Sequence, residues 1–237
     1  MGLQARIKRN WTPVATRYAG TDSFWLLSPS YLALQRSIFP AIKKYASGVV
    51  LDAGAGKLPY KPILSSVATR YLAVDIALTN QDIDVIADIQ ELPIDDNSID
   101  TVFCSQVIEH VPDTGKTFGE FHRVLRPGGF LILTAPHLGY LHNEPHDYYR
   151  FTNYGLTHMT ESAGLSVVSV DAIGGLVSYL GHLCSTVTVG VWGAVPVLGP
   201  FALAANRLWS RSVVRLDALI GMKNLFALDY MLIARKP

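Results

Sequence analysis

The chain has 237 residues, enough for one large domain with an appendage and a buried core. Charged residues make up 16%, against about a quarter in an average protein, and the mean hydropathy of +0.25 is high for a soluble enzyme. Two cysteines, Cys104 and Cys184, form neither a disulfide framework nor a zinc-binding spacing, and no apolar leader follows the basic start. We therefore expect a reducing, cytoplasmic location, either free or on the cytoplasmic membrane surface.

The charge is divided along the sequence. Residues 1–47 have a net charge of +6, residues 48–171 of −9 and residues 172–237 of +4. An acidic middle flanked by basic ends argues against a nucleic-acid surface running through that segment. Basic ends beside apolar sequence suit an anionic membrane, although solvated charge is the more common reason for such runs.

The elements follow one another in a regular order. Residues 1–47 are expected to be a helical flank or lid. Five apolar runs rich in Val, Ile and Leu are predicted strands, and each ends near Asp, Ser or Pro: 48–53, 70–76, 84–89, 100–105 and 129–136. A helix is predicted before the fifth strand, where apolar residues recur at helical spacing: Phe118, Phe121, Val124 and Leu125. A helix at 152–164, a strand at 165–173 and a last strand within 225–237 complete the chain.

Strands that alternate with helices predict an α/β fold, with a seven-stranded, mostly parallel sheet and helices on both faces. The core is expected at 48–171, with an apolar helical insert at 172–224 before the final strand. Ligands are expected at the carboxyl ends of the strands, where parallel sheets bind them.

The stretch VVLDAGAGKLPYKP, residues 49–62, follows the first predicted strand. Backbone N–H groups there are expected to face a ligand that the glycines allow to come close. Pro59 stands where a dinucleotide-binding loop has its third glycine, and no Gly-Lys-Ser/Thr is present, so both phosphate-binding patterns fail. Asp52, just before the glycines, would repel a pyrophosphate but attract an ammonium or sulfonium cation. The chemistry favours S-adenosylmethionine over NAD.

Downstream acids agree with this interpretation. Asp75 ends the second predicted strand, where its two oxygens can accept both ribose hydroxyls, and Asp88 lies in the third, where it can accept the adenine amino group. Together, VVLDAGAG, YLAVDI, IADIQELPIDDNSIDTVFCSQVIEHVPD and VLRPGGFLILTAP resemble the successive motifs of the class I S-adenosylmethionine-dependent methyltransferases, in the type 11-like branch that methylates small molecules and lipids. The resemblance spans residues 40–171 plus the final strand.

The resemblance implies a Rossmann-like fold and a set of cofactor-binding residues. The methionine part of S-adenosylmethionine would lie along Asp52, Gly54 and Gly56, the ribose at Asp75 and Ile76, the adenine between Asp88 and Ile89, and the sulfonium near Ser105 and Gln106. Structural alternatives exist, since a glycine pair can be a simple turn and an acid at a strand end can cap a helix. Glu109 and His110 could either stabilise the next helix or contact ligand. KLPYKP departs from the family pattern.

The segment 137–156 lies at the mouth of the predicted site. Its histidines, 137, 142 and 146, do not have a spacing typical of metal sites, so no metal is expected. PHDYYRFT resembles a substrate-pocket segment of the same methyltransferase branch. His146 is the first candidate for the base because an imidazole ordinarily titrates near neutrality, Asp147 is the second, and Tyr149 would orient the substrate with Tyr148 and Arg150. Alternatively, these side chains hold the loop on the sheet.

Residues 172–206 contain no Asp, Glu, Lys or Arg. The run is long enough to span a bilayer once, but its glycines and prolines at 190–200 would interrupt a single span and predict two apolar helices meeting near Pro196. Peripheral membrane contact, a cover over the substrate pocket and a homodimer face are all open.

The sequence thus predicts an S-adenosylmethionine-dependent methyltransferase acting on a small acceptor, lipid-like, quinone or carbohydrate. A NAD-type oxidoreductase and a non-catalytic, cofactor-binding membrane module are the alternatives.

Overall fold

The computed structural model describes the chain from residue 3 to residue 237 and divides it into two compact units. The sheet unit consists of residues 38–172 and 229–237, and the helical unit consists of the chain up to residue 37 and residues 173–228. The helical unit therefore combines most of the predicted N-terminal flank with the predicted apolar insert. The first two residues of that flank lie outside the described residues.

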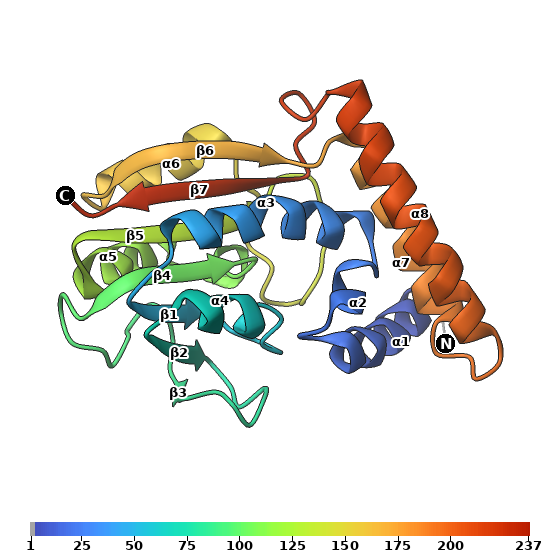
Figure 1. Cartoon of the computed structure of the whole chain (residues 1–237), viewed down its shortest axis with the longest axis horizontal. Coiled ribbons are helices and arrows are strands. Elements are labelled where there is room, and N and C mark those ends of the chain that lie inside the picture. Colours follow the sequence, from blue (N-terminus) through green and yellow to red (C-terminus); the bar gives the residue numbers. More distant parts are fainter. Residues whose placement is uncertain (1–2) are drawn as a thin grey trace. The chain divides into compact units, whose positions relative to one another are not determined.

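The sheet has seven strands in the order β3-β2-β1-β4-β5-β7-β6, which can be followed in Figure 1. Their bounds are β1 Val49–Ala53, β2 Arg70–Asp75, β3 Val85–Ile86, β4 Ile99–Ser105, β5 Leu125–Pro136, β6 Ser166–Ile173 and β7 Asp229–Arg235. The pairs among β1 to β5 are parallel, and β7 runs antiparallel to β5. The predicted seven-stranded, mostly parallel sheet of a Rossmann-like fold is confirmed.

Two strands differ in length from their predictions. The third spans only Val85–Ile86, because the Asp88 carbonyl accepts a hydrogen bond from the N–H of Glu91 and the chain turns there. The fifth begins at Leu125 rather than 129, because Leu125 pairs with Ile99 before the register shifts at the start of the regular ladder.

Helices α4 (Lys61–Val67), α5 (Thr114–Val124) and α6 (Asn153–Ser162) belong to the sheet unit. Figure 1 shows α5 and α6 behind the strands and α4 in front of them. Helix α5 begins where the Asp113 carboxylate accepts the N–H of Lys116, and it buries Phe118 and Phe121 completely. The apolar periodicity that predicted this helix is thus the face that packs into the core.

The helical unit contains α1 (Leu3–Tyr18), α2 (Asp22–Trp25), α7 (Leu176–Trp192) and α8 (Leu198–Ile220), while α3 (Pro29–Tyr45) begins there and ends in the sheet unit. Helices α7 and α8 meet on either side of Pro196, as predicted. Glycines let α7 pack closely, since a Cβ at Gly181 would lie 2.6 Å from the Val213 side chain and one at Gly190 would lie 2.8 Å from Ile7. Within residues 3–237, no helix combines the length and apolarity that crossing a membrane requires.

Candidate active site

The loop after β1 is folded onto the end of β2. The N–H groups of Gly54 and Ala55 donate to the Val74 carbonyl at 2.9 and 3.0 Å, and the Gly56 N–H donates to Asp75 Oδ2 at 2.7 Å. The expectation that these N–H groups face a ligand is therefore wrong, because the neighbouring strand uses all three. What the loop offers instead is the ordered carboxylate of Asp75.

The glycines give this loop its shape. Gly54 and Gly56 have φ values of +79° and +54°, in the left-handed region that favours glycine. A Cβ at Gly54 would lie 2.5 Å from Val107, whereas one at Gly56 would meet nothing within 4 Å. The backbone at Gly56 is therefore open to a ligand that comes close, as a cofactor cradle requires.

Acid and apolar side chains lie together at the end of β2. Asp75 is 8% exposed, and its Oδ1 also accepts the N–H of Ala77 at 3.3 Å. The next residue, Ile76, is 72% exposed. A carboxylate beside an uncovered apolar side chain can bind the hydroxyls of a ribose while the apolar surface covers part of a base.

Asp52 is buried at the carboxyl end of β1. Its Oδ2 accepts a hydrogen bond of 2.6 Å from the Tyr71 hydroxyl. Burial raises the pKa of Asp52 to about 7, although the hydrogen bond from Tyr71 opposes that shift, and burial and the Asp52 charge raise the pKa of Tyr71. A cation bound beside Asp52 would favour the carboxylate form, which suits an ammonium or sulfonium group and not a phosphate.

Asp88 and Ile89 follow β3. The Asp88 carboxylate accepts two hydrogen bonds of 2.9 Å, from the backbone N–H and the side-chain amide of Gln90. Ile89 is 5% exposed, and the Ala87 N–H donates to the Asp75 carbonyl at 2.9 Å, which ties the segment to β2. Asp88 thus orders a turn next to the predicted ribose site.

Ser105 and Gln106 end β4 beside a residue that sequence reasoning missed. Ser105 Oγ lies 3.0 Å from the Tyr60 hydroxyl and 2.8 Å from Thr134 Oγ1, and the Gln106 N–H donates to the Thr134 carbonyl at 3.0 Å. Tyr60 belongs to the unusual KLPYKP stretch, and its ring packs edge-on against Phe103. The departure from the family pattern thus brings a hydroxyl to the predicted sulfonium side.

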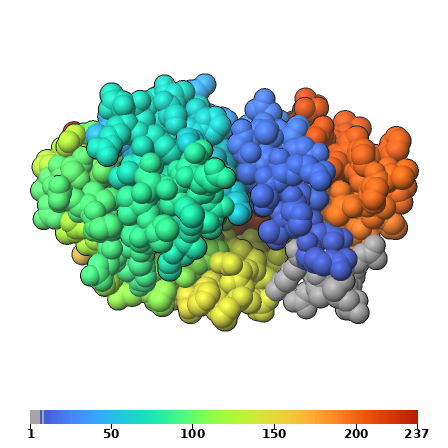
Figure 2. All heavy atoms as spheres, turned by 90° about the horizontal axis from the view of Figure 1, so that it is seen from below, coloured from blue at the N-terminus to red at the C-terminus, as the bar shows by residue number. Residues whose placement is uncertain are grey.

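The three loop histidines do not converge. His137 Nδ1 lies 2.8 Å from the Phe151 carbonyl, His146 Nδ1 lies 3.1 Å from the Tyr148 hydroxyl, and the His142 ring packs edge-on against His110. The segment that holds them is yellow in Figure 2 and lies on the surface. The partner of His142 therefore comes from the turn after β4.

The second candidate base is held in an ion pair. Asp147 Oδ1 and Oδ2 accept hydrogen bonds from the two terminal nitrogens of Arg150 at 2.7 and 2.9 Å, and Oδ2 also accepts the His142 N–H at 2.8 Å. The Arg150 guanidinium lowers the pKa of Asp147 to about 2. This geometry supports the alternative interpretation, in which Asp147 orders the loop.

His146 and Tyr149 are both exposed, the Tyr149 ring at 39%. The Tyr149 hydroxyl donates to the Pro112 carbonyl at 2.8 Å, and the N–H groups of Tyr148 and Tyr149 donate to the Glu109 carbonyl at 2.8 and 3.3 Å. The loop is thus fixed to the turn after β4, while the His146 imidazole stays accessible to a substrate.

Two buried acids lie beneath this loop. Glu109 is fully buried, and neither of its carboxylate oxygens has a hydrogen-bond partner among the described residues. Asp229, at the start of β7, is 3% exposed, and burial followed by the Glu109 charge raises its pKa to about 8. The sequence offered one signal for Asp229, an acid at the start of a largely apolar final strand.

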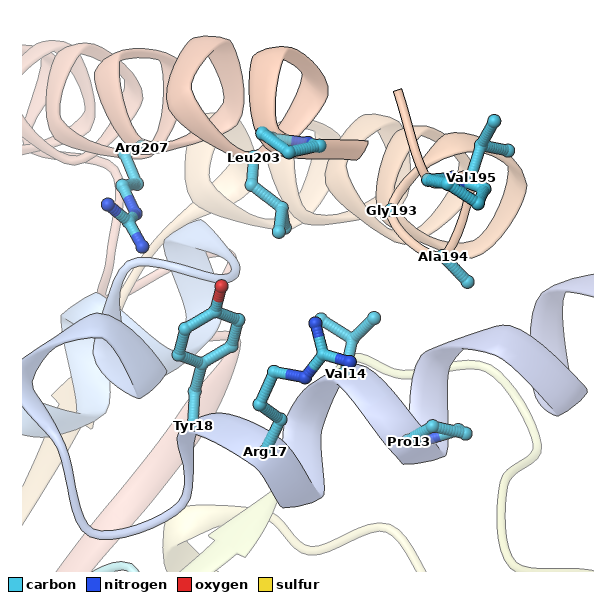
Figure 3. Close-up of a pocket in the computed structure, with 11 residues that line it drawn as sticks. Pro13, Val14, Arg17, Tyr18, Gly193, Ala194, Val195, Leu203 and Arg207 are labelled. Atoms are coloured by element: carbon cyan, nitrogen blue, oxygen red, sulfur yellow. The ribbon is translucent and has the colours of Figure 1, made fainter. Parts of the chain in front are cut away.

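A cavity of about 480 Å³ lies in the helical unit, and none of its lining residues is among those predicted to bind the cofactor. Figure 3 shows Arg17 and Tyr18 on α1 facing Leu203 and Arg207 on α8. Prolines, valines, a glycine and an alanine complete the lining, and the Arg207 guanidinium carbon lies 5.8 Å from the centre of the Tyr18 ring. Two guanidinium groups above apolar walls suit an amphipathic anion.

Comparison with known proteins identifies the sheet unit. A family model described as a methyltransferase domain matches residues 51–133. A malonyl-[acyl-carrier protein] O-methyltransferase of Yersinia pestis is 29% identical over 102 residues, or 39% of this chain and 38% of that protein. A probable S-adenosylmethionine-dependent methyltransferase of Mycolicibacterium smegmatis is 33% identical over 96 residues, or 37% of each chain. The similarity thus spans less than two fifths of these curated relatives.

Solved structures share the fold at lower identity. The [4+2]-cyclase SpnF has a TM-score of 0.58 at 17% identity, with 88% of this chain and 80% of that chain covered. Phosphoethanolamine N-methyltransferase 2 of Haemonchus contortus, in complex with phosphomonomethylethanolamine and S-adenosylhomocysteine, has a TM-score of 0.55 at 18% identity, with coverages of 87% and 56%. Since one of these proteins is named a cyclase, the fold alone does not establish methyl transfer.

Proposed function

Since the sheet unit belongs to the class I S-adenosylmethionine-dependent methyltransferases, with a type 11 methyltransferase domain at residues 51–133, we propose that this protein transfers a methyl group from S-adenosylmethionine to a small acceptor. The observation that carries the proposal is the convergence of Asp52 and Asp75 at the carboxyl ends of adjacent parallel strands, beside the open backbone of Gly56. S-adenosylmethionine, when bound, supplies an electrophilic methyl group on a sulfonium.

The chain's own residues would bind and orient the cofactor. Asp75 accepts hydrogen bonds from the ribose hydroxyls next to Ile76, Asp52 balances the positive charge of the methionine end, and Asp88 with Ile89 borders the adenine. Ser105 and Gln106 lie at the end of β4, where the acceptor would meet the methyl group. Gly54 supports this arrangement because its missing side chain makes room for Val107.

We propose that His146 is the base that removes the proton of the acceptor. Its imidazole is exposed, and its Nδ1 is 3.1 Å from the Tyr148 hydroxyl, a contact that can orient the ring. Asp147, already ion-paired with Arg150, would hold the loop, and Tyr149 would offer its half-exposed ring to the acceptor.

A lipid-related acceptor is the class we favour. Similarity to a malonyl-[acyl-carrier protein] O-methyltransferase supports acyl chemistry. The helical unit supports contact with an anionic membrane, because its nine basic and two acidic residues give it a net charge of +7. Its acid on α8, Asp217, points inward and accepts hydrogen bonds from Gly175 and Ser178.

Calorimetry separates the three functional classes. We expect S-adenosylhomocysteine to bind with one-to-one stoichiometry and NAD to give no heat; binding of NAD alone would point to the oxidoreductase alternative. Methyl transfer from labelled S-adenosylmethionine to acyl-carrier and free acyl acceptors then tests catalysis. His146→Ala should lower turnover and leave the affinity for S-adenosylhomocysteine unchanged, whereas a folded protein that binds the cofactor but methylates none of the acceptors would favour the non-catalytic module.

A further inference from the structure

The turn after β4 and the loop after β5 bring three metal-ligating side chains together. Glu109 and His110 come from the turn, and His142 comes from the loop. One ligand atom of each lies within 4.8 Å of the other two. Glu109 Oε1 is 3.7 Å from His110 Nε2 and 3.8 Å from His142 Nε2, distances too long for hydrogen bonds.

Both imidazoles are oriented by their other ring nitrogen. His110 Nδ1 is 2.6 Å from the His146 carbonyl oxygen, which can only accept, so Nδ1 carries a proton and the neutral ring has its lone pair on Nε2. His142 Nδ1 has three polar neighbours: the Tyr140 carbonyl at 3.2 Å, a terminal nitrogen of Arg150 at 3.4 Å and Asp147 Oδ2 at 3.5 Å. The nearest is an acceptor, so a neutral ring that donates from Nδ1 has its lone pair on Nε2.

This arrangement is the one that metal-binding histidines adopt. Such histidines donate the second N–H to a carbonyl or carboxylate, which fixes the ring and its tautomer. With both imidazoles neutral and no cation, each Nε2 lone pair would face the Glu109 carboxylate oxygen at less than 4 Å.

The buried negative charge around these ligands also favours a bound cation. Glu109 is fully buried, and the side chain of Asp147 is 2% exposed and paired with the guanidinium of Arg150. Both oxygens of Glu109 and the Oδ2 of Asp229 are buried without a hydrogen-bond partner among the described residues. The imidazoles of His110 and His142 lie within 4 Å of Glu109 Oε1 but beyond hydrogen-bond range. A buried carboxylate without a hydrogen bond is unfavourable, and a divalent ion between these groups would supply the missing partner.

We propose that Glu109, His110 and His142 bind a divalent transition-metal ion of the zinc class. Two imidazoles and one carboxylate are a ligand set typical of catalytic zinc sites, which leave a fourth position open. Zinc bonds of 2.0 to 2.1 Å would separate the ligand atoms by roughly 3.3 Å, within reach of small side-chain rotations. His142, 39% exposed, is the entry side.

The open position gives the ion a role in the reaction, and this role rests on the proposed methyl transfer. An acceptor oxygen bound there would lose its proton more readily, because the ion stabilises the resulting negative charge. The spacing of histidines 137, 142 and 146 did not predict a metal site. It could not do so, because two of the three proposed ligands, Glu109 and His110, lie outside that loop.

Zinc titration of tag-free protein, first freed of metal with a chelator, tests the site without cofactor or acceptor. We expect one Zn²⁺ per chain by calorimetry, and Co²⁺ in its place should show the visible absorption of a site with few ligands. His142→Ala and the near-isosteric Glu109→Gln should each weaken Zn²⁺ binding at least a hundredfold, while His158→Ala, which alters an exposed histidine on α6, should leave it unchanged.

Circular dichroism and binding of S-adenosylhomocysteine confirm that each variant is folded. Folded wild-type protein that takes up no Zn²⁺ would overturn the metal site, and so would equal affinity in wild type and His142→Ala. Because cofactor binding is measured separately, loss of the metal proposal leaves the methyltransferase proposal standing, and the reverse also holds.

Discussion

The Tyr71 hydroxyl lies 2.6 Å from Asp52 Oδ2, so the acid that begins the cofactor loop receives a hydrogen bond from the neighbouring strand. This bond favours the carboxylate, while burial opposes it more strongly and holds the pKa of Asp52 at about 7. The ordinary pKa of an aspartic acid is 3.8. The difference has a direct consequence for stability.

Asp52 should make folding pH-dependent. Between about pH 4 and pH 7 the folded state binds a proton that the unfolded state has lost, so the contribution of Asp52 to stability is greatest below pH 4 and falls as the pH rises to 7. The full effect is up to roughly 4 kcal/mol. Urea unfolding should therefore show Asp52→Asn gaining stability relative to wild type as the pH rises through this range.

Tyr71→Phe is the matched variant. It removes the hydrogen bond that stabilises the carboxylate, so the pKa of Asp52 should rise and the pH window should move upward. A stability difference between Asp52→Asn and wild type that stays constant from pH 4 to pH 8 would contradict the assignment.

We predict that Asp75 contributes more to cofactor binding than to the stability of the fold. Asp75→Asn should weaken S-adenosylhomocysteine binding by one to two orders of magnitude, because hydrogen bonds to a charged group are worth about 1.5–3 kcal/mol. Asp84→Asn is the control. Asp84 Oδ2 accepts the N–H of Ala73 at 2.8 Å, and Ala73 lies on β2, the strand that ends at Asp75. Calorimetry should find cofactor affinity unchanged in that variant, and equal losses in both would mean that Asp75 acts only through the fold.

The Tyr60 hydroxyl should act through Ser105. Tyr60→Phe keeps the ring against Phe103 and removes the oxygen 3.0 Å from Ser105 Oγ, so cofactor affinity should fall a few-fold, by about 1 kcal/mol. Ser105→Ala should lower cofactor affinity by a similar amount, and the double variant should lower it little more than either single variant. Strictly additive losses in the double-mutant cycle would show that the two hydroxyls act independently.

The parts of the fold that depend on local pattern could be predicted. Buried strands such as β1 and β4 are continuous apolar runs, and Asp75 marks a strand end, so the sheet and the cofactor acids follow from the sequence. The left-handed backbone conformation of Leu58, with a φ of +59°, could not be predicted, because no glycine marks it. Leu58 is instead buried in a cluster with Ala55 and Ala73.

The cluster at Glu109 was equally beyond sequence reasoning. Glu109 and His142 are 33 positions apart, and they meet only because the loop after β5 turns back to donate two N–H groups to the Glu109 carbonyl. No spacing within the loop contains that information. The helical unit is the intermediate case: its two apolar helices were predicted, while the position of Asp217 on their inner side was not.

Helix α8 provides the test of membrane contact. Its outer surface carries Phe201, Leu208 and Leu219, 74%, 68% and 84% exposed, together with the exposed Arg211 and Arg215. Apolar side chains among arginines suit a bilayer of anionic lipid. Co-sedimentation should show full-length protein bound to vesicles containing phosphatidylglycerol and released from neutral ones.

Phe201→Ser with Leu219→Ser should reduce that binding at least tenfold, since each substitution withdraws a large apolar side chain from the lipid. The control is Val168→Ser, which removes an apolar side chain, 47% exposed, from β6 of the sheet unit. High salt should weaken binding as well, because the arginines act through charge. Unchanged sedimentation of the double variant would exclude α8 as the contact, and a shift from dimer to monomer in the same variant would identify this face as a surface between two copies of the chain.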